Sequence, residues 1–202
     1  MGTGVQGYTS MQMILRAMPQ ISRIIACDLS PERRQDFIDR GKSEYPEIEF
    51  QGIDDHRDAL KNSDIVVYAT SADRPLLENG VPGEGITVIT VCELLTRTSV
   101  GMFDRWYVDF AECALERYND GGSQSAAARG VAWEDLVMDD VAGELGDVIT
   151  GKLPGRTSDS ERILAGAVGI SVEDIICAES VYQKAMADGG GRILPFQDLQ
   201  DL

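Results

Sequence analysis

A glycine-rich turn at the start of the chain constrains the fold more than any other feature. The motif GTGVQG occupies residues 2–7, helix-like sequence follows it, and the apolar run RIIAC then ends at Asp28. A glycine turn, a helix, a strand and an acid in this order are typical of the Rossmann βαβ unit, which binds dinucleotides. Gly2 permits the tight turn, and Gly4 lets the backbone approach a diphosphate closely.

The residues after the turn predict how such a ligand would be held. A helix that begins near Val5 and Gln6 offers free backbone N–H groups and the positive end of its dipole to the phosphates. Asp28 follows the glycines by about 20 residues, where an acid accepts hydrogen bonds from the adenosine ribose. Its carboxylate would repel a 2′-phosphate and therefore favours NAD over NADP. The alternative is that Asp28 merely caps the next helix, a role for which Ser30 is better placed.

Strand-like and helix-like segments alternate along most of the chain, which predicts an α/β fold with a doubly wound, mostly parallel sheet. The strand that should precede the glycine turn is missing from the sequence, so the fold is expected to lack it. Residues 120–128 are rich in Gly, Ser and Ala and predict a surface loop, and residues 133–138 predict a helix. Strands are expected at residues 23–29, 48–51, 64–70, 86–91, 106–110 and 162–168, and helices at 8–18, 31–40, 54–62, 142–150 and 170–186.

Charge and cysteine usage exclude several classes of function. The chain has 34 acidic and 18 basic residues and a net charge of −16, which disfavours nucleic acids and anionic membranes as partners. Its four cysteines are widely spaced, without the paired spacing of a zinc site or a disulfide framework. We therefore expect no metal and a reducing, cytoplasmic location, with neither a signal peptide nor a transmembrane run.

Three segments together resemble one protein family. They are GTGVQG at 2–7, YATSADRPLL at 68–77 and the long segment from GELGDVITGKLPGRTSD to ESVYQKA at 143–185. The chain resembles the ornithine cyclodeaminase/mu-crystallin family, whose members include ornithine cyclodeaminase, alanine dehydrogenase and ketimine reductases. The resemblance implies an NAD-dependent enzyme that transfers hydride at the α-carbon of an amino or imino acid. A non-catalytic dinucleotide-binding module of the mu-crystallin type is the alternative.

The resemblance also predicts the domain organisation. Family members carry an N-terminal substrate and dimerisation domain, onto which the C-terminal helix packs, and this chain is expected to lack the equivalent domain. Residues 1–169 are expected to form a dinucleotide-binding domain without its first strand. Residues 170–202 are expected to belong to the substrate domain, and the full-length protein is expected to be a homodimer.

Several residues at predicted strand ends match cofactor-binding or catalytic positions of the family. Thr70 and Ser71 follow one strand and are expected against the cofactor, although a threonine there is also ordinary strand-to-loop sequence. Val91 ends the next strand, and Val168 matches a turn near the nicotinamide. Glu93 is the nearest carboxylate to the family's acid–base position and is the candidate catalytic residue; a surface glutamate is the alternative. The family's Val-Gly motif is replaced by Val91-Cys92, which puts ornithine cyclodeamination itself in doubt.

Two other features of the sequence are given structural interpretations. His56 is the only histidine and follows two aspartates at a predicted helix start, so a solvated helix cap is favoured over a catalytic base. The segment Arg156-Thr157-Ser158-Asp159 is characteristic of the family, and a structural turn explains it as well as a binding site does.

Overall fold

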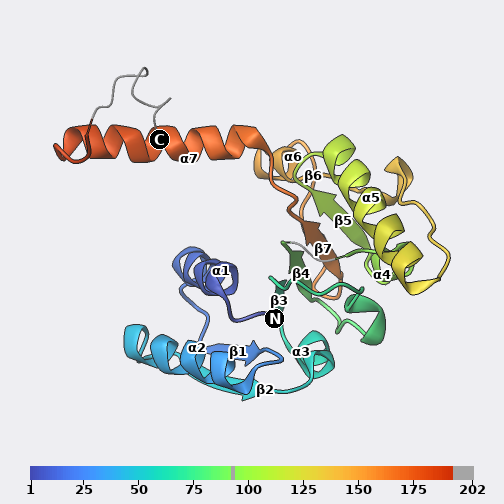
Figure 1. The fold of residues 1–202 in the computed structure, drawn as a ribbon, viewed down its shortest axis with the longest axis horizontal. Coiled ribbons are helices and arrows are strands. Elements are labelled where there is room, and N and C mark those ends of the chain that lie inside the picture. The colour runs from blue at the N-terminus through green and yellow to red at the C-terminus, as the bar shows by residue number, and fades with distance from the viewer. Residues whose placement is uncertain (92–93, 193–202) are drawn as a thin grey trace. The chain divides into compact units, whose positions relative to one another are not determined.

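The computed structural model describes residues 1–91 and 94–192, which fall into two units. The first unit spans Met1–Val168 and contains every strand described. The second begins at Gly169, and its described part is built on the helix α7 (Ser171–Ala187), drawn in orange to red (Figure 1).

The strands of the first unit form two sheets in which every pairing is parallel. One sheet has the order β1-β2 and the other the order β3-β4-β7-β5-β6. This confirms the predicted α/β class, and each strand overlaps a predicted segment except the two-residue β6. The strands are β1 (Arg23–Cys27), β2 (Glu49–Ile53), β3 (Ile65–Tyr68), β4 (Thr87–Thr90), β5 (Arg105–Val108), β6 (Gly143–Glu144) and β7 (Ile163–Gly166).

Helices connect most successive strands, with only a 3₁₀ turn between β3 and β4, and the helix ends follow local sequence signals. Ser30 caps α2 by accepting a hydrogen bond from the Arg33 backbone N–H at 3.3 Å, and Pro31 occupies the first helical position. The Asp55 side chain caps α3 by accepting from the Arg57 backbone N–H at 2.9 Å. The helices of this unit are α1 (Val5–Ala17), α2 (Pro31–Glu44), α3 (His56–Asn62), α4 (Arg97–Val100), α5 (Ala111–Arg129) and α6 (Leu145–Ile149), with short 3₁₀ turns at Leu77–Asn79 and Met138–Asp140.

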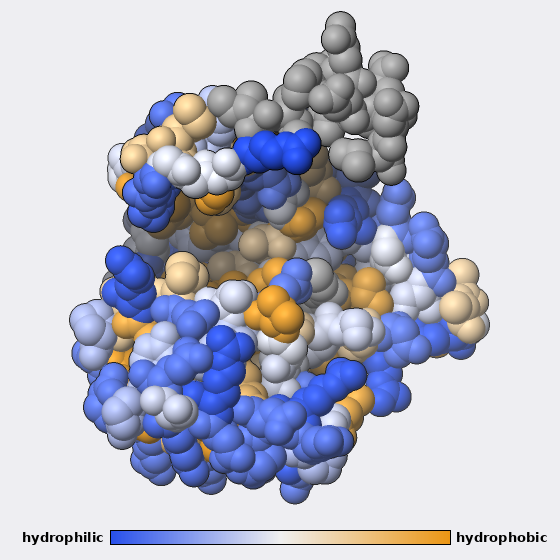
Figure 2. All heavy atoms as spheres, turned by 60° about the vertical axis from the view of Figure 1, so that its left-hand side comes forward, coloured by the Kyte–Doolittle hydropathy of each residue, from blue (hydrophilic) through white to orange (hydrophobic). Residues whose placement is uncertain are grey.

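The smaller sheet has its own hydrophobic cluster with α1 and α2. Tyr8, Phe37 and Phe50 pack there with their rings edge to face. Gly41 allows α2 to approach β2, because a Cβ at this position would lie 2.3 Å from the Phe50 ring. The outer side of α2 is mostly charged, and the lower part of the surface, where α2 and β2 lie, is hydrophilic (Figures 1 and 2).

A second hydrophobic cluster surrounds the five-stranded sheet. Trp106 of β5 packs against Tyr118 of α5 with ring centroids 5.9 Å apart. Leu164 of β7 and Val88 of β4 are fully buried in the same cluster. Apolar β-branched and aromatic residues on these strands therefore form a sheet buried on both faces, as parallel sheets are.

Met1 and Gly2 join the two sheets. The Met1 amino group donates to the Val67 carbonyl of β3 at 2.8 Å, and the Ala69 N–H donates to the Met1 carbonyl at 2.9 Å. The Gly2 N–H donates to the Cys27 carbonyl of β1 at 3.0 Å. These two residues thus occupy the end of a strand position between β1 and β3, close to the N label in Figure 1.

The rest of this strand position is a cavity of about 610 Å³. Its walls are β1, β3 and α1, with Ile25, Ile65 and Met11 among the lining residues. In parallel strands, alternate residues point their backbone N–H and C=O groups to opposite sides. The Ser22 carbonyl accepts a hydrogen bond from β2, and the Asp64 carbonyl accepts one from β4. Ile25 is three positions after Ser22 and Ile65 is one position after Asp64, so by this alternation their backbone groups point the other way, into the cavity.

The predictions for residues 120–128 and 133–138 were wrong. Residues 120–128 continue helix α5, and residues 131–137 are irregular. The irregular segment packs along α5. The Trp133 ring lies against Gly122, and a Cβ added to Gly122 would be only 1.9 Å from the nearest atom of that ring. The Asn119 side chain holds both backbone polar groups of Leu136 at 2.8 and 2.9 Å. Tertiary packing has overridden the weak helix propensity of the glycines.

Candidate functional site

The glycine turn is packed tightly on two sides. Gly2 has φ +80°, and a Cβ there would lie 2.2 Å from the Ala69 carbonyl oxygen. A Cβ on Gly7 would lie 2.0 Å from the carbonyl oxygen of Gly2. These two positions accept only glycine, because the atoms in the way belong to the backbone.

The third glycine of the motif faces open space. A Cβ on Gly4 would meet no heavy atom within 4 Å among the described residues. Gly4 is the N-cap of α1, yet no side chain caps this helix and its first turn contains no acid. Val5 is 82% exposed, and Gln6 is exposed beside it. This helix end therefore presents a positive dipole and an accessible backbone, which suits a diphosphate.

Asp28 is held directly against the glycine turn. Its Oδ2 accepts hydrogen bonds from the Thr3 backbone N–H at 2.8 Å and from the Thr3 hydroxyl at 2.9 Å. Its Oδ1 accepts from the Ser30 backbone N–H at 2.9 Å. Burial by itself would raise the pKa of Asp28, but these hydrogen bonds outweigh it and lower the pKa below its ordinary value. Asp28 is thus a fixed carboxylate, and the cap of α2 is Ser30 instead.

Sequence reasoning missed Thr3. Its hydroxyl connects the turn to the acid that lies 25 positions later. The sequence does place a hydroxyl residue between the first two glycines, but the glycine motif does not specify which residue occupies that position.

The other expected cofactor residues follow the carboxyl ends of strands, at one edge of the sheet. Thr70 lies beside the glycine turn, since a Cβ on Gly2 would be 3.3 Å from its Cγ2. Ser71 is exposed next to it. Val91 donates its backbone N–H to the Tyr68 carbonyl at 2.9 Å, and Val168 packs on the core of the five-stranded sheet. In open α/β sheets this edge is where ligands bind.

The candidate catalytic residue Glu93 lies outside the described residues. Two other carboxylates at the carboxyl edge already have structural partners. Glu144 accepts from the Ala111 backbone N–H at 3.0 Å at the start of α5, and Asp109 accepts from the Phe110 N–H at 2.9 Å.

His56 is a packed residue and not the solvated cap that was expected. Its side chain is 21% exposed, its Nε2 lies 3.2 Å from the Leu76 carbonyl oxygen, and its ring meets Tyr68 edge to face. Asp55 caps the helix in its place. His56 thus ties the start of α3 to the loop before Leu77, and this contact gives it a structural role.

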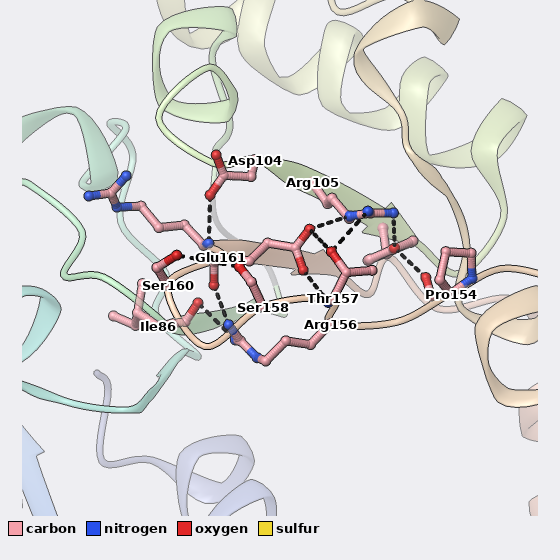
Figure 3. A network of polar contacts seen from close by, with 11 residues as sticks. Ile86, Asp104, Arg105, Pro154, Arg156, Thr157, Ser158, Ser160 and Glu161 are labelled. Atoms are coloured by element: carbon pink, nitrogen blue, oxygen red, sulfur yellow. Dashed lines mark hydrogen bonds and ion pairs between the residues drawn. The ribbon is translucent and has the colours of Figure 1, made fainter.

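The segment from Arg156 to Glu161 forms a polar network at the opposite, amino edge of the sheet (Figure 3). Glu161 is 9% exposed and accepts from the Thr157 N–H at 2.6 Å and from the Arg105 guanidinium. Arg156 donates to the Thr87 hydroxyl at 2.8 Å and to the Glu161 carbonyl. These contacts connect the beginnings of β4, β5 and β7, so the geometry favours the structural interpretation of this segment.

The described residues show neither a metal cluster nor a membrane-spanning helix. No group of three or more His, Cys, Asp or Glu side chains is arranged to hold a metal ion within residues 1–91 and 94–192. No helix in the same residues is long and apolar enough to cross a membrane.

Comparison with known proteins agrees with the fold. Residues 1–189 match the model of the ornithine cyclodeaminase/mu-crystallin family. An N-((2S)-2-amino-2-carboxyethyl)-L-glutamate dehydrogenase of Staphylococcus aureus is 27% identical over 195 residues, which cover 96% of this chain and 56% of that protein. An alanine dehydrogenase of Archaeoglobus fulgidus is 24% identical over 212 residues, with 96% and 59% covered.

A solved structure gives the same result. The Thermococcus litoralis Δ¹-pyrroline-2-carboxylate reductase in complex with NADH and L-proline has a TM-score of 0.81 and 25% identity, with 96% of this chain and 59% of that chain covered. The chain thus spans a little over half the length of the relatives that it matches. With a family model matched over nearly its whole length, the chain belongs to the ornithine cyclodeaminase/mu-crystallin family.

Proposed function

We propose that this chain binds NAD(H) and forms the cofactor-binding part of an enzyme that transfers hydride at the α-carbon of an amino or imino acid. The observation that carries the proposal is the fixed Asp28 carboxylate beside the open, uncapped start of α1. The backbone at Gly4, Val5 and Gln6 would hold the diphosphate, and Asp28 would hold the adenosine ribose. The names of its relatives, a reductase and two dehydrogenases of amino or imino acids, support this choice of chemistry.

The bound nicotinamide supplies the hydride acceptor or donor for such a reaction. The protein has to orient the cofactor and move a proton between the substrate nitrogen and solvent when an amine becomes an imine. Thr70, Ser71, Val91 and Val168 are the residues that we propose to face the cofactor from the strand ends. Glu93 is the proposed acid–base residue, and this assignment depends on the sequence alone.

A fluorescence titration tests the function most directly. We expect the chain to bind NADH more tightly than NADPH, because the Asp28 carboxylate repels a 2′-phosphate. A panel of amino acids, with NAD reduction and ammonia release followed together, then separates an enzyme from a binding module of the mu-crystallin type. Absence of NADH binding would contradict both the enzyme and the binding-module form of the proposal.

We place the protein in the cytoplasm, where its thiols would remain reduced.

We further propose that the cavity between β1 and β3 is the place of a parallel strand that leads into Met1. The proposal rests on the bonds of Met1 and Gly2 to both neighbouring strands and on the inward-pointing backbone of Ile25 and Ile65. Burial lowers the pKa of the Met1 amino group, so a charge at this position is unfavourable. An amide in its place would carry no charge.

An N-terminal extension of five β-branched residues, the length of β1, is therefore expected to stabilise the chain. We expect the free energy of unfolding to rise by about 2 kcal/mol or more, from buried apolar side chains less the cost of ordering them. Chemical denaturation measures the change. The control is an extension of equal length with proline at alternate positions, which cannot donate to the sheet. Equal effects of the two extensions would refute the strand.

Residues 170–202 are proposed to belong to a substrate and dimerisation domain. No residue of α7 is buried, and one side of the helix carries exposed apolar residues, namely Val172, Ile175, Ile176, Tyr182 and Met186. Such a stripe needs a partner. We expect the chain to self-associate at micromolar concentration, and Ile175→Glu together with Ile176→Lys to reduce association. Light scattering measures both, and a stable monomer would argue against this assignment and against the proposed homodimer.

A further inference from the structure

The loop after β3, which carries the proposed cofactor residues Thr70 and Ser71, is tied to helix α5. The Ser125 hydroxyl of α5 donates to the Asp73 carbonyl of this loop at 2.7 Å. The two residues are 52 positions apart, so the hydrogen bond is a tertiary contact between the helix and the loop. It holds the backbone only two positions after Ser71.

A second hydrogen bond connects this part of the loop to the Thr70 side chain. The backbone N–H of Ala72, the residue directly before Asp73, donates to Thr70 Oγ1 at 3.3 Å. The same side chain lies beside the glycine turn, because a Cβ on Gly2 would be 3.3 Å from Thr70 Cγ2. A hydroxyl that accepts one hydrogen bond can still donate its own hydrogen. The Ala72 bond therefore orients Thr70 without using its donor.

The same face of α5 also reaches the end of the neighbouring strand. Tyr118 precedes Ser125 by seven positions, two helical turns, which places both residues on one face of the helix. The Tyr118 hydroxyl lies 3.4 Å from the hydroxyl of Thr90, the last residue of β4. Because β3 and β4 are adjacent and parallel, this face of α5 contacts both chain segments that leave the carboxyl edge there.

The hydrogen bond of Ser125 differs from the usual one of a serine in a helix. Such a hydroxyl commonly donates to a carbonyl one turn earlier in its own helix. Ser123 does so, since its hydroxyl donates to the Asp120 carbonyl at 3.0 Å. Ser125 donates to the loop instead. Its hydroxyl therefore acts on the loop backbone, and Ser123 provides a natural comparison.

We propose that Ser125 is a positioning residue of the cofactor site, which holds Thr70 in place through the Asp73 carbonyl and the Ala72 N–H. This inference rests on the proposed function, because it concerns how that site is built. Without the Ser125 hydroxyl, the Asp73 carbonyl loses its hydrogen bond to α5 and the loop gains conformations in which Thr70 is displaced. Binding of NADH must then restrict these conformations, and this ordering lowers the affinity.

Fluorescence titration of NADH against four proteins tests the proposal: the unaltered chain, Ser125→Ala, Thr70→Val and the double variant. We expect Ser125→Ala to raise the dissociation constant about fivefold, the effect of one neutral hydrogen bond. Thr70→Val keeps the shape of the side chain, removes its hydroxyl and should weaken binding by at least as much. Since Ser125 acts through Thr70, adding Ser125→Ala to Thr70→Val should raise the dissociation constant by less than about twofold.

Two further variants separate positioning from a general effect on the helix. Ser123→Ala removes the hydroxyl that bonds within α5, and it should keep the dissociation constant within about twofold of that of the unaltered chain. Ser125→Thr restores a hydroxyl and should restore the affinity to the same range. Alanine is a better helix former than serine, so both alanine variants should remain folded. Thermal unfolding checks this.

Three outcomes would overturn the inference. They are a folded Ser125→Ala protein with unchanged affinity, losses from Ser125→Ala and Thr70→Val that add in the double variant, and a Ser125→Thr protein without recovered affinity. In each case NADH binding by the unaltered chain leaves the proposed function standing. An unaltered chain that does not bind NADH refutes the proposed function and this inference together.

Discussion

Gly4→Ala is expected to abolish most NADH binding while the protein remains folded. The new methyl group would meet no heavy atom within 4 Å among the described residues, so the expected cost to the fold is only the roughly 1 kcal/mol by which glycine is preferred to alanine at an N-cap. The same methyl group would stand where a diphosphate has to approach the start of α1. We expect the dissociation constant for NADH to rise about 100-fold, which corresponds to losing one or two charge-assisted hydrogen bonds. Fluorescence titration measures the change.

Gly146 provides the matched control for this prediction. Like Gly4, Gly146 has a φ outside the left-handed region, and a Cβ added to it would meet no heavy atom within 4 Å among the described residues. Unlike Gly4, it lies in α6 and is not part of the glycine turn. Gly146→Ala should leave NADH binding unchanged. Gly2→Ala tests the opposite case, because its Cβ would clash with the Ala69 carbonyl and its φ is +80°. That variant should lose stability as well as binding. NADH affinity that survives Gly4→Ala would remove the glycine turn from the binding site.

Glu161→Ala is expected to cause a large loss of stability for a polar substitution. The carboxylate holds Arg105 at the start of β5 and both polar groups of Thr157, and it is nearly buried. Removing it leaves those donors without their acceptor, which is more costly than losing an exposed ion pair. We expect the melting temperature to fall by roughly 5 °C or more. NADH affinity of the folded fraction should stay the same, because the network lies at the amino edge of the sheet.

An exposed glutamate serves as the control. Glu134 pairs with Arg97 at 3.0 Å, and its side chain is 73% exposed. Exposed pairs of this kind contribute little, so Glu134→Ala should shift the melting temperature by about 1 °C or less. Similar falls in melting temperature for the two variants would show that the Glu161 network stabilises the fold no more than an exposed ion pair does.

The pH dependence gives a second measurement of Glu161. The Thr157 backbone N–H, the Arg105 side chain and the Thr157 hydroxyl hold the pKa of this carboxyl below its ordinary value. A group whose pKa is lower in the folded state stabilises the fold above its unfolded pKa. That stabilisation is lost as the pH falls through the folded pKa. The difference in stability between the unaltered protein and Glu161→Gln should therefore be largest near neutral pH and shrink below about pH 4.3.

The positions of most strands along the chain could be predicted because buried parallel strands are continuous apolar runs. Residues 64–70 and 86–91 were recognisable as strands on this basis, and β3 and β4 lie within them. The glycine turn was recognisable because its residues satisfy a backbone requirement that other residues cannot meet. The sequence motif therefore predicted where Gly2 and Asp28 would lie.

Other features depend on contacts between residues distant in sequence, and local patterns do not contain them. Gly122 looks like a helix breaker until the Trp133 ring is seen to occupy the space of its missing side chain. The role of Glu161 depends on Arg105, which is 56 positions away. The partner of His56 is a backbone carbonyl in a loop, which has no sequence signature.

The two hydrophobic clusters of the first unit have a consequence for how the protein responds to its ligand. Asp28 stands at the end of a strand in one cluster, and Thr70 follows a strand of the other. A dinucleotide that bound residues of both clusters would connect them, and we expect it to suppress any local opening of one cluster without the other. Ligand binding would then merge two local unfolding events into one cooperative transition, and hydrogen exchange would slow most in β1 and β2.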